Sequence, residues 1–246
     1  MIKRLIISYL LALVMMPLFA QTDITVHDDR TGNDEVIGLP EGMTYELDSL
    51  LKDWHTKNFL ENDISCESSD ENPQYTKEEY ISRLNRLPNI IEMPYNEVVR
   101  QLIDRYCTKL RRSVSYMLGA NNFYVPIFEE ALESYQVPLE LKYLPIIESA
   151  LNPGATSRAG AAGLWQFMVK TGKIYGLDVN SLIDERRDPI KSSYAAAHYL
   201  KDLYQIFNDW TLAIAAYNCG PANVNKAIRR AGGSKDYWVI YPYLPK

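Results

Sequence analysis

The chain has 246 residues and a formal net charge of −5, with 47% hydrophobic and 23% charged residues. This length can bury one good core with a smaller appendage, or two small domains, and the composition is ordinary for a soluble globular protein. The acidic balance excludes a general nucleic-acid-binding protein, because such proteins use an excess of Lys and Arg to neutralise phosphates.

The first twenty residues have the pattern of a secretory signal peptide. Lys3 and Arg4 precede an apolar run over residues 5–18, and Ala20 is followed by polar residues. A charged start, a short apolar stretch and a small final residue are typical of a segment removed after export. An uncleaved membrane anchor is the alternative, although the run is short for a full span. We expect an exported protein without a lipid anchor, since the first cysteine is Cys66.

Residues 21–95 are predicted to be a leader with short helices. Residues 21–40 are polar and contain turn formers, so we expect an extended or disordered stretch there. Leu47 to Trp54 have apolar residues at helical spacing, which favours one short helix. The capping box Thr76–Glu79 is expected to open a second helix, which the prolines after it end. No alternating strand of convincing length is found.

From Asn96 onward the apolar residues recur at three- and four-residue spacing. We therefore predict an all-α domain over residues 96–246. Its first helix is expected to stop at Gly119, and Pro126 and Pro138 are expected to begin the next two, because Pro fits the first helical turn.

Further start signals follow in the second half of the domain. Asp188-Pro189 is read as an N-cap followed by Pro in the first turn, and Asp209 as the cap of a helix over 210–217. That segment is apolar nearly all round, which indicates a buried central helix. Pro221 is expected to begin the last helix.

The cysteines and histidines form no metal motif. Three cysteines cannot all pair within one chain, and neither residue type shows a ligand spacing; they are Cys66, Cys107, Cys219, His27, His55 and His198. We expect the cysteines to be buried small hydrophobic residues rather than a disulfide framework. No metal site is predicted.

Glu148 is the candidate functional residue that periodicity singles out. Leu141, Leu144 and Leu151 lie at −7, −4 and +3 from it, so at about 100° per residue all four share one helical stripe. A carboxyl group on an apolar face should have a raised pKa and keep its proton near neutral pH, which suits a general acid. Pro145 is expected to kink this helix.

The alternative for Glu148 is structural: a buried ion pair with Arg158 or Arg187 would also place a carboxylate there. Periodicity alone does not separate that pair from a catalytic acid. The residues that follow Glu148 in the sequence bear on the choice.

Three motifs in order, with a phrase between them, resemble the lysozyme-like lytic transglycosylase (SLT) domain. Residues 144–153 are similar to its Glu-Ser motif, residues 163–168 to its second motif, and residues 216–220 to its Ala-Tyr-Asn-x-Gly motif. The phrase at 184–189 resembles the membrane-bound lytic murein transglycosylase D branch of that family. The resemblance covers about Asn96 to Lys246.

The resemblance implies a lysozyme-like helical fold that binds peptidoglycan glycan strands in the periplasm or cell envelope of a bacterium. It implies no cofactor, and other cell-wall enzymes are further candidate partners. Glu148 would cleave the bond between N-acetylmuramic acid and N-acetylglucosamine and leave 1,6-anhydro ends, as the single catalytic carboxylate. Asp188 and Asp209 are expected to be occupied as caps. Asp184-Glu185 are expected to form solvated pairs with Arg186-Arg187.

Carried over by position, five residues would serve the substrate. Gln166 and Met168 would line the groove, Tyr217 would orient the reacting centre, Asn218 would bind substrate or brace the loop, and Ser149 would hydrogen-bond substrate or Glu148. A structural role is the alternative for each. Trp165, Phe167 and Met168 could equally be core, and Tyr217 with Asn218 could simply end a helix.

Two departures from the family pattern stand out. Val169 replaces a common Pro, and the chain ends at Lys246, where the family usually continues, so we expect a domain truncated at its C-terminal end. Two rival functions therefore remain open. One is a goose-type lysozyme-like hydrolase, and the other is a non-catalytic peptidoglycan-binding envelope protein.

Overall fold

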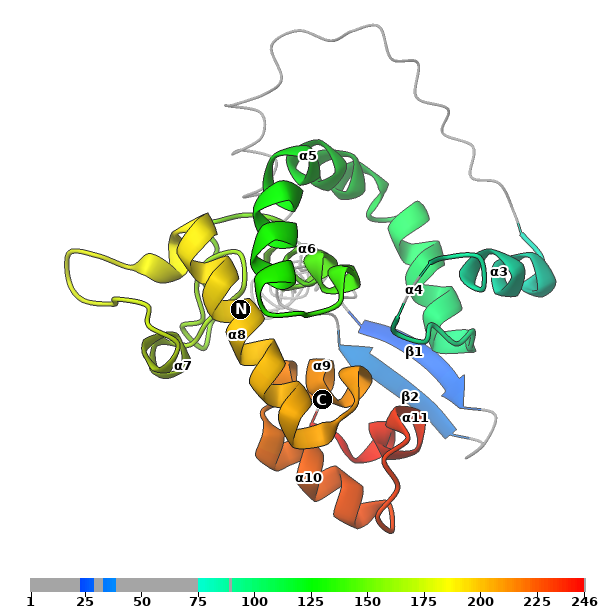
Figure 1. Ribbon diagram of the computed structural model, residues 1–246. Coiled ribbons are helices and arrows are strands. Elements are labelled where there is room, and N and C mark those ends of the chain that lie inside the picture. The colour runs from blue at the N-terminus through cyan, green and yellow to red at the C-terminus, as the bar shows by residue number, and fades with distance from the viewer. Residues whose placement is uncertain (1–22, 29–32, 39–74, 89, 246) are drawn as a thin grey trace, which may run out of the picture.

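The computed structural model describes residues 23–28, 33–38, 75–88 and 90–245 (Figure 1). The predicted signal peptide, the helix near Leu47 and the residue Cys66 lie outside these ranges. Within them the chain is helical apart from one two-stranded hairpin. The all-α class predicted for the main domain is therefore confirmed.

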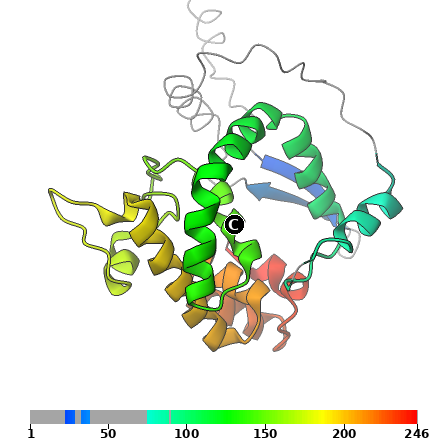
Figure 2. The same cartoon turned by 45° about the horizontal axis from the view of Figure 1, so that its top comes forward.

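The hairpin corrects the expectation that the chain has no convincing strand, and it makes the extended alternative for 21–40 the right one where the structure describes this stretch. Strand β1 (Asp23–Asp28) pairs antiparallel with β2 (Asn33–Gly38), and Asp23 lies opposite Gly38. A two-stranded hairpin is marginal by itself. Here β1 also lies against helix α4 (Glu97–Cys107), as Figures 1 and 2 show. That contact joins residues far apart in the sequence, which local composition does not report.

The capping box predicted at Thr76 is confirmed. It opens α3 (Lys77–Leu84): the Thr76 hydroxyl accepts from the amide of Glu79, and the Glu79 carboxylate accepts from the amide of Thr76. The next helix, α4, is capped by Asn96, whose side chain accepts from the amide of Val99 at 2.9 Å.

The predicted helix end at Gly119 is wrong. The chain breaks earlier, around Thr108, and α5 (Arg111–Ser134) then runs through both Gly119 and Pro126. A helical Gly costs about 1 kcal/mol and Pro more, but one side of α5 buries a row of side chains whose burial outweighs these costs; the row is Met117, Tyr124, Phe128, Ala131 and Leu132. Figures 1 and 2 show α5 changing direction along its length, as expected for a helix containing Pro.

The segment that carries Glu148 is two short helices rather than one. A 3₁₀ helix, η2 (Leu139–Tyr143), follows Pro138, and α6 (Leu144–Ser149) follows η2. Pro145 occupies the first turn of α6, where its missing N–H is not needed, and so marks the change of helix type. Ala150 and Leu151 then adopt left-handed φ values of 50° and 63°. Leu151 is fully buried but lies beyond the helix, so it does not share the predicted stripe.

The remaining elements are α7 (Val169–Ile174), η3 (Glu185–Arg187), α8 (Pro189–Phe207), α9 (Trp210–Cys219), α10 (Pro221–Arg230), α11 (Tyr237–Ile240) and η4 (Tyr241–Tyr243). Of these, the three that begin at residues 189, 210 and 221 follow predicted start signals, and the other four were not predicted. Asp188 caps α8 and Asp209 caps α9, as predicted. Helix α10 is not the last, because α11 and η4 follow it. Val169 is the first residue of α7, where Pro would also fit.

Helix α8 is the centre of the packing, with α5 against one side and α9 against another (Figure 1). The first part of the core contains Phe128, Leu132, Leu151, Leu164, Trp165 and Leu200. The second part contains Leu203, Leu212, Val224 and Ile240. Three residues pack against both parts: Tyr199, Trp210 and Tyr217.

The expectation for the cysteines is corrected where the structure describes them. Cys107 is exposed at the end of α4, and Cys219 is only partly buried. Both are free thiols. Cys107 occupies the last turn of α4, a helix without a buried residue, and apolar periodicity alone did not resolve this.

Candidate active site

Glu148 lies one residue before the end of α6 and is partly buried. Burial raises the pKa of its carboxyl group from 4.5 to about 7. This confirms the prediction that the group holds a proton close to neutral pH. The cause is burial, as predicted, but the setting is a short helix closed by the left-handed turn at Ala150 and Leu151 rather than a long apolar stripe.

The alternative ion pair with Arg187 is not formed. The Arg187 guanidinium donates to the carbonyl of Gly154 and to the Thr156 hydroxyl, both at 2.6 Å, and lies 3.5 Å from the Asp184 carboxylate. Arg158 is exposed on the loop. Burial is the cause of the pKa shift at Glu148, and an ion pair would instead have lowered that pKa.

Tyr217 connects α9 to the region of Glu148. Its hydroxyl donates to the carbonyl of Trp165 at 2.7 Å. Burial, and after it the negative charge of Glu148, raises the pKa of Tyr217 well above its ordinary value. The phenol ring and the carboxyl group are therefore close enough to interact, although they lie 69 positions apart in the chain, at 217 and 148.

Ser149 does not take the position predicted for it. Its side chain is fully buried, and its hydroxyl lies 3.0 Å from the carbonyl oxygen of Pro145 and 2.9 Å from that of Leu164. A contact with substrate is thus excluded for this side chain in this conformation. Because Ser149 directly follows Glu148, its side chain points about 100° further around the helix, into the core. There it joins α6 to the loop that follows.

Residues 154–168, called the motif loop below, carry the other predicted groove residues. Gln166 has a left-handed φ of 47° and its side-chain amide donates to the carbonyl of Gly163 at 2.8 Å. Met168 is 44% exposed, whereas Trp165 and Phe167 are buried. Of these three apolar residues, only Met168 is thus available at the surface. Asn218, at the end of α9, is also exposed.

Sequence reasoning missed the role of Arg186. We expected solvated pairing, but Arg186 is only 6% exposed. Its guanidinium pairs with Asp184 and also reaches the motif loop. The sequence feature that could have revealed this role is the small-residue loop. Such a loop packs closely, and its buried carbonyls need hydrogen-bond donors. Glu185 does pair with a basic residue, but that residue is Lys191.

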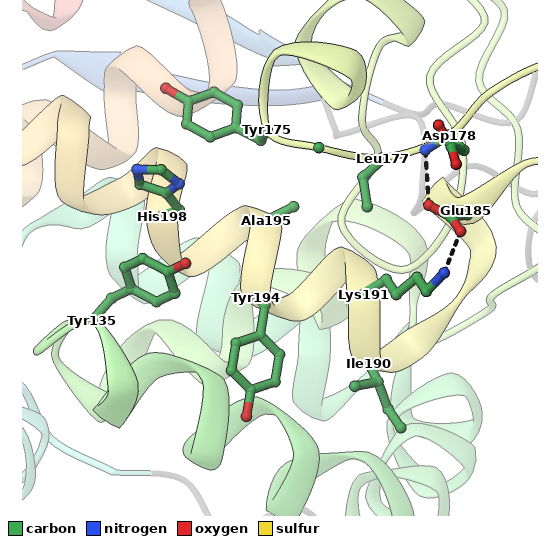
Figure 3. A pocket seen from close by; sticks show the side chains of 11 residues that line it. Tyr135, Tyr175, Leu177, Asp178, Glu185, Ile190, Lys191, Tyr194, Ala195 and His198 are labelled. Carbon is green, nitrogen blue, oxygen red and sulfur yellow. Dashed lines mark hydrogen bonds and ion pairs between the residues drawn. The ribbon is translucent and has the colours of Figure 1, made fainter.

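Two cavities among the described residues are lined by other side chains than Glu148. One, of about 440 Å³, lies on the outer side of α8 between Tyr135 and the turn at Leu177 (Figure 3). Another, of about 380 Å³, lies between Ile90 and Trp210. Within the described residues no group of three or more His, Cys, Asp or Glu side chains is placed to hold a metal ion.

Known proteins were compared with the chain. Residues 126–240 match the family model described as the Transglycosylase SLT domain. The chain is 38% identical over 168 residues to membrane-bound lytic murein transglycosylase D of Escherichia coli K12, which covers 63% of this chain and 36% of the relative. It is 34% identical over 129 residues to membrane-bound lytic murein transglycosylase F of Maricaulis maris, covering 47% of this chain and 26% of that protein.

A third relative is the soluble lytic murein transglycosylase of Escherichia coli K12, 34% identical over 103 residues, which covers 40% of this chain and 16% of the relative. The chain spans just over a third of the length of the first relative, 36%. Every predicted site residue, from Glu148 to Asn218, lies inside the matched segment 126–240. Over that segment the chain is similar to the transglycosylase SLT domain family.

Proposed function

We propose that this protein is a lytic transglycosylase that cleaves the β-1,4 bond between N-acetylmuramic acid and N-acetylglucosamine in peptidoglycan. The observation that carries the proposal is Glu148, a partly buried carboxyl group whose pKa is raised by burial to about 7, inside an SLT domain. A group with that pKa can both give and take a proton near neutral pH. The names of the relatives, lytic murein transglycosylases, support the same reaction class.

In the proposed reaction Glu148 donates its proton to the glycosidic oxygen as the bond from that oxygen to C1 of the muramic acid breaks. The sugar passes through an oxocarbenium-like state. Its own 6-hydroxyl oxygen then bonds to C1, and the hydroxyl proton goes to the Glu148 carboxylate. The product carries a 1,6-anhydro ring, no water is consumed, and Glu148 ends protonated as it began.

One carboxylate suffices for this route, whereas hydrolases pair two carboxyl groups about 5–9.5 Å apart. A second carboxylate at such a distance would raise the pKa of Glu148 through its own charge. Among the described residues, burial is the cause of that shift. The chemical nature of the digestion products decides between the transglycosylase and the goose-type hydrolase.

The groove residues belong to the same proposal. Gln166, Met168 and Asn218 are offered as substrate contacts, because each has a polar or apolar group at least partly accessible. Tyr217 is offered as the residue that orients the reacting centre beside Glu148. Ser149 is left out, because its hydroxyl is buried against backbone carbonyls.

The test is digestion of purified peptidoglycan by the wild type and by Glu148→Gln, with mass spectrometry of the released glycan. The wild type should release species lighter by one water than hydrolysis products, and the variant should lose at least about a hundredfold in rate, the lower range for a general acid. Reducing muramic acid ends would identify the hydrolase. Sedimentation with peptidoglycan but no lysis by either protein would identify a binding protein.

We propose export to the cell envelope, on the charged start and apolar run of residues 1–20. Within the described residues, no helix combines the length and the apolar character that crossing a bilayer requires. Mass spectrometry of the protein purified from the envelope should find a chain that begins at Gln21. An intact Met1 would contradict cleavage.

A further inference from the structure

The segment Asp184–Pro189 is the sequence motif that the proposed chemistry leaves without a role. Its middle residues form η3, and their side chains contact two different parts of the molecule. Glu185 pairs with Lys191 of α8 and accepts from the amide of Asp178 at 2.8 Å, as Figure 3 shows. The two arginines instead reach the motif loop, so η3 joins α8 to that loop.

Arg186 holds the motif loop at two carbonyls. Its Nε and Nη2 donate to the two oxygens of Asp184, both at 2.8 Å. Its Nη1 donates to the carbonyl of Gly160 at 2.8 Å and to that of Phe167 at 2.9 Å. The bidentate pair compensates the buried charge, and the fixed fork geometry leaves the remaining N–H groups for the loop.

The backbone of η3 also touches the loop. A Cβ atom at Gly163 would lie 1.8 Å from the carbonyl oxygen of Arg186, and the φ of Gly163 is +84°. A side chain is therefore excluded at Gly163 by both contact and backbone conformation. Arg187 adds two bonds of 2.6 Å, to the carbonyl of Gly154 and the hydroxyl of Thr156.

The opposite side of the same loop is bonded to the neighbours of Glu148. The carbonyl of Leu164 accepts from Ser149, the residue after Glu148, at 2.9 Å. The carbonyl of Trp165 accepts from Tyr217 at 2.7 Å. Between Gly160 and Phe167 the loop thus links the buried guanidinium of Arg186 on one side to the surroundings of Glu148 on the other.

We propose that Arg186 is a positioning residue for the reaction: it fixes the motif loop, and the loop keeps Ser149 and Tyr217 where they exclude water from Glu148. This inference rests on the proposed function for its catalytic readout. Asp184 shares the role as the partner of Arg186. In Arg186→Lys the ammonium group would keep the charge. It could not bond both oxygens of Asp184 and both carbonyls of the motif loop at once.

Loosening the loop should admit water to Glu148. Less burial would then bring the pKa of that carboxyl group down from about 7 towards its ordinary value. Tyr217 of α9 is a titratable residue that interacts with Glu148. Its phenol stays neutral over the pH range in which Glu148 titrates. Because the reaction needs a protonated Glu148, the alkaline limb of the rate profile should move to lower pH.

The experiment compares the wild-type chain with Arg186→Lys and Asp184→Asn on soluble glycan strands, at a temperature where each protein is folded. We expect kcat to fall between about tenfold and a hundredfold, the range for small misplacement of a site, with KM changed less than about twofold. The alkaline limb should shift to lower pH in both variants. Lys191→Gln, which removes the exposed ion pair of η3, should retain wild-type kcat and profile.

Amide hydrogen exchange over residues 154–168 separates the two proposals. Faster exchange in Arg186→Lys than in Lys191→Gln supports the positioning role even if the wild type proves inactive, in which case only the proposed function fails. A folded Arg186→Lys protein with wild-type exchange, kcat and pH profile overturns the inference. If Arg186→Lys does not fold, Asp184→Asn decides, because it preserves the side-chain shape.

Discussion

The pKa of Glu148 depends on where α6 ends. The helix is six residues long, and Ala150 and Leu151 turn the chain left-handed directly after it. The carboxyl group is therefore close to a buried turn and to Tyr217. Apolar spacing predicted the burial of Glu148 correctly. One member of the predicted stripe, Leu151, is buried too, but it lies in the turn after α6 and not in the helix.

Glu148 should make stability depend on pH. Its folded pKa of about 7 lies above the ordinary value of 4.5, so the folded state binds the proton more tightly than the unfolded state. Its contribution is complete below pH 4.5 and is lost as pH rises through about 7. As pH rises from 4.5 to about 7, the melting temperature of the wild type should fall relative to that of Glu148→Gln. Above that window the difference between the two melting temperatures should stay level.

The comparison uses the Gln variant because it removes the titration and leaves every other carboxylate in place. A difference between the two proteins that does not vary from pH 4.5 to 8 would contradict a raised pKa at Glu148. The same protonation should cause the proposed lytic activity of the wild type to decline above about pH 7.

At the scale of elements, α5 is the case in which local preference and packing disagree. Gly119 is exposed within the helix, and an added Cβ there would meet no atom within 4 Å. Gly119→Ala should therefore raise the free energy of unfolding by about 0.5–1 kcal/mol, the usual gain from replacing a helical Gly. Urea unfolding monitored by circular dichroism measures it.

Gly163→Ala is the matched contrast for Gly119→Ala. The same added methyl group would lie 1.8 Å from the Arg186 carbonyl oxygen at a φ of +84°, so this variant should be destabilised. If both substitutions changed stability in the same direction, the assignment of Gly119 to an open helical site would be wrong.

At the scale of the molecule, two groups of core residues share a boundary. Tyr199, Trp210 and Tyr217 pack against both, and α8 supplies Leu200 to one and Leu203 to the other. Such shared residues should make the helical domain unfold as one unit. Tyr217 also couples α9 to the motif loop, because its hydroxyl donates to the carbonyl of Trp165.

Leu212→Ala tests that unity. Leu212 is fully buried in the second group, and its truncation should cost about 2–5 kcal/mol. Unfolding of the variant should shift by the same amount whether monitored by tryptophan fluorescence or by helical circular dichroism. Two separated transitions, with only one of them moved, would show that the groups unfold independently. Ile206→Ala, an exposed position on α8, serves as control.

The sequence by itself determined the helical class, the caps at Thr76, Asp188 and Asp209, and the burial of Glu148, because these depend on spacing within one or two helical turns. It did not determine where α5 ends, which way Ser149 points or that Arg186 is buried. Each of those depends on contacts between segments far apart in the chain, such as Arg186 with Gly160 and Phe167. Only the tertiary structure brings such donors and acceptors together, and their burial outweighs local preference.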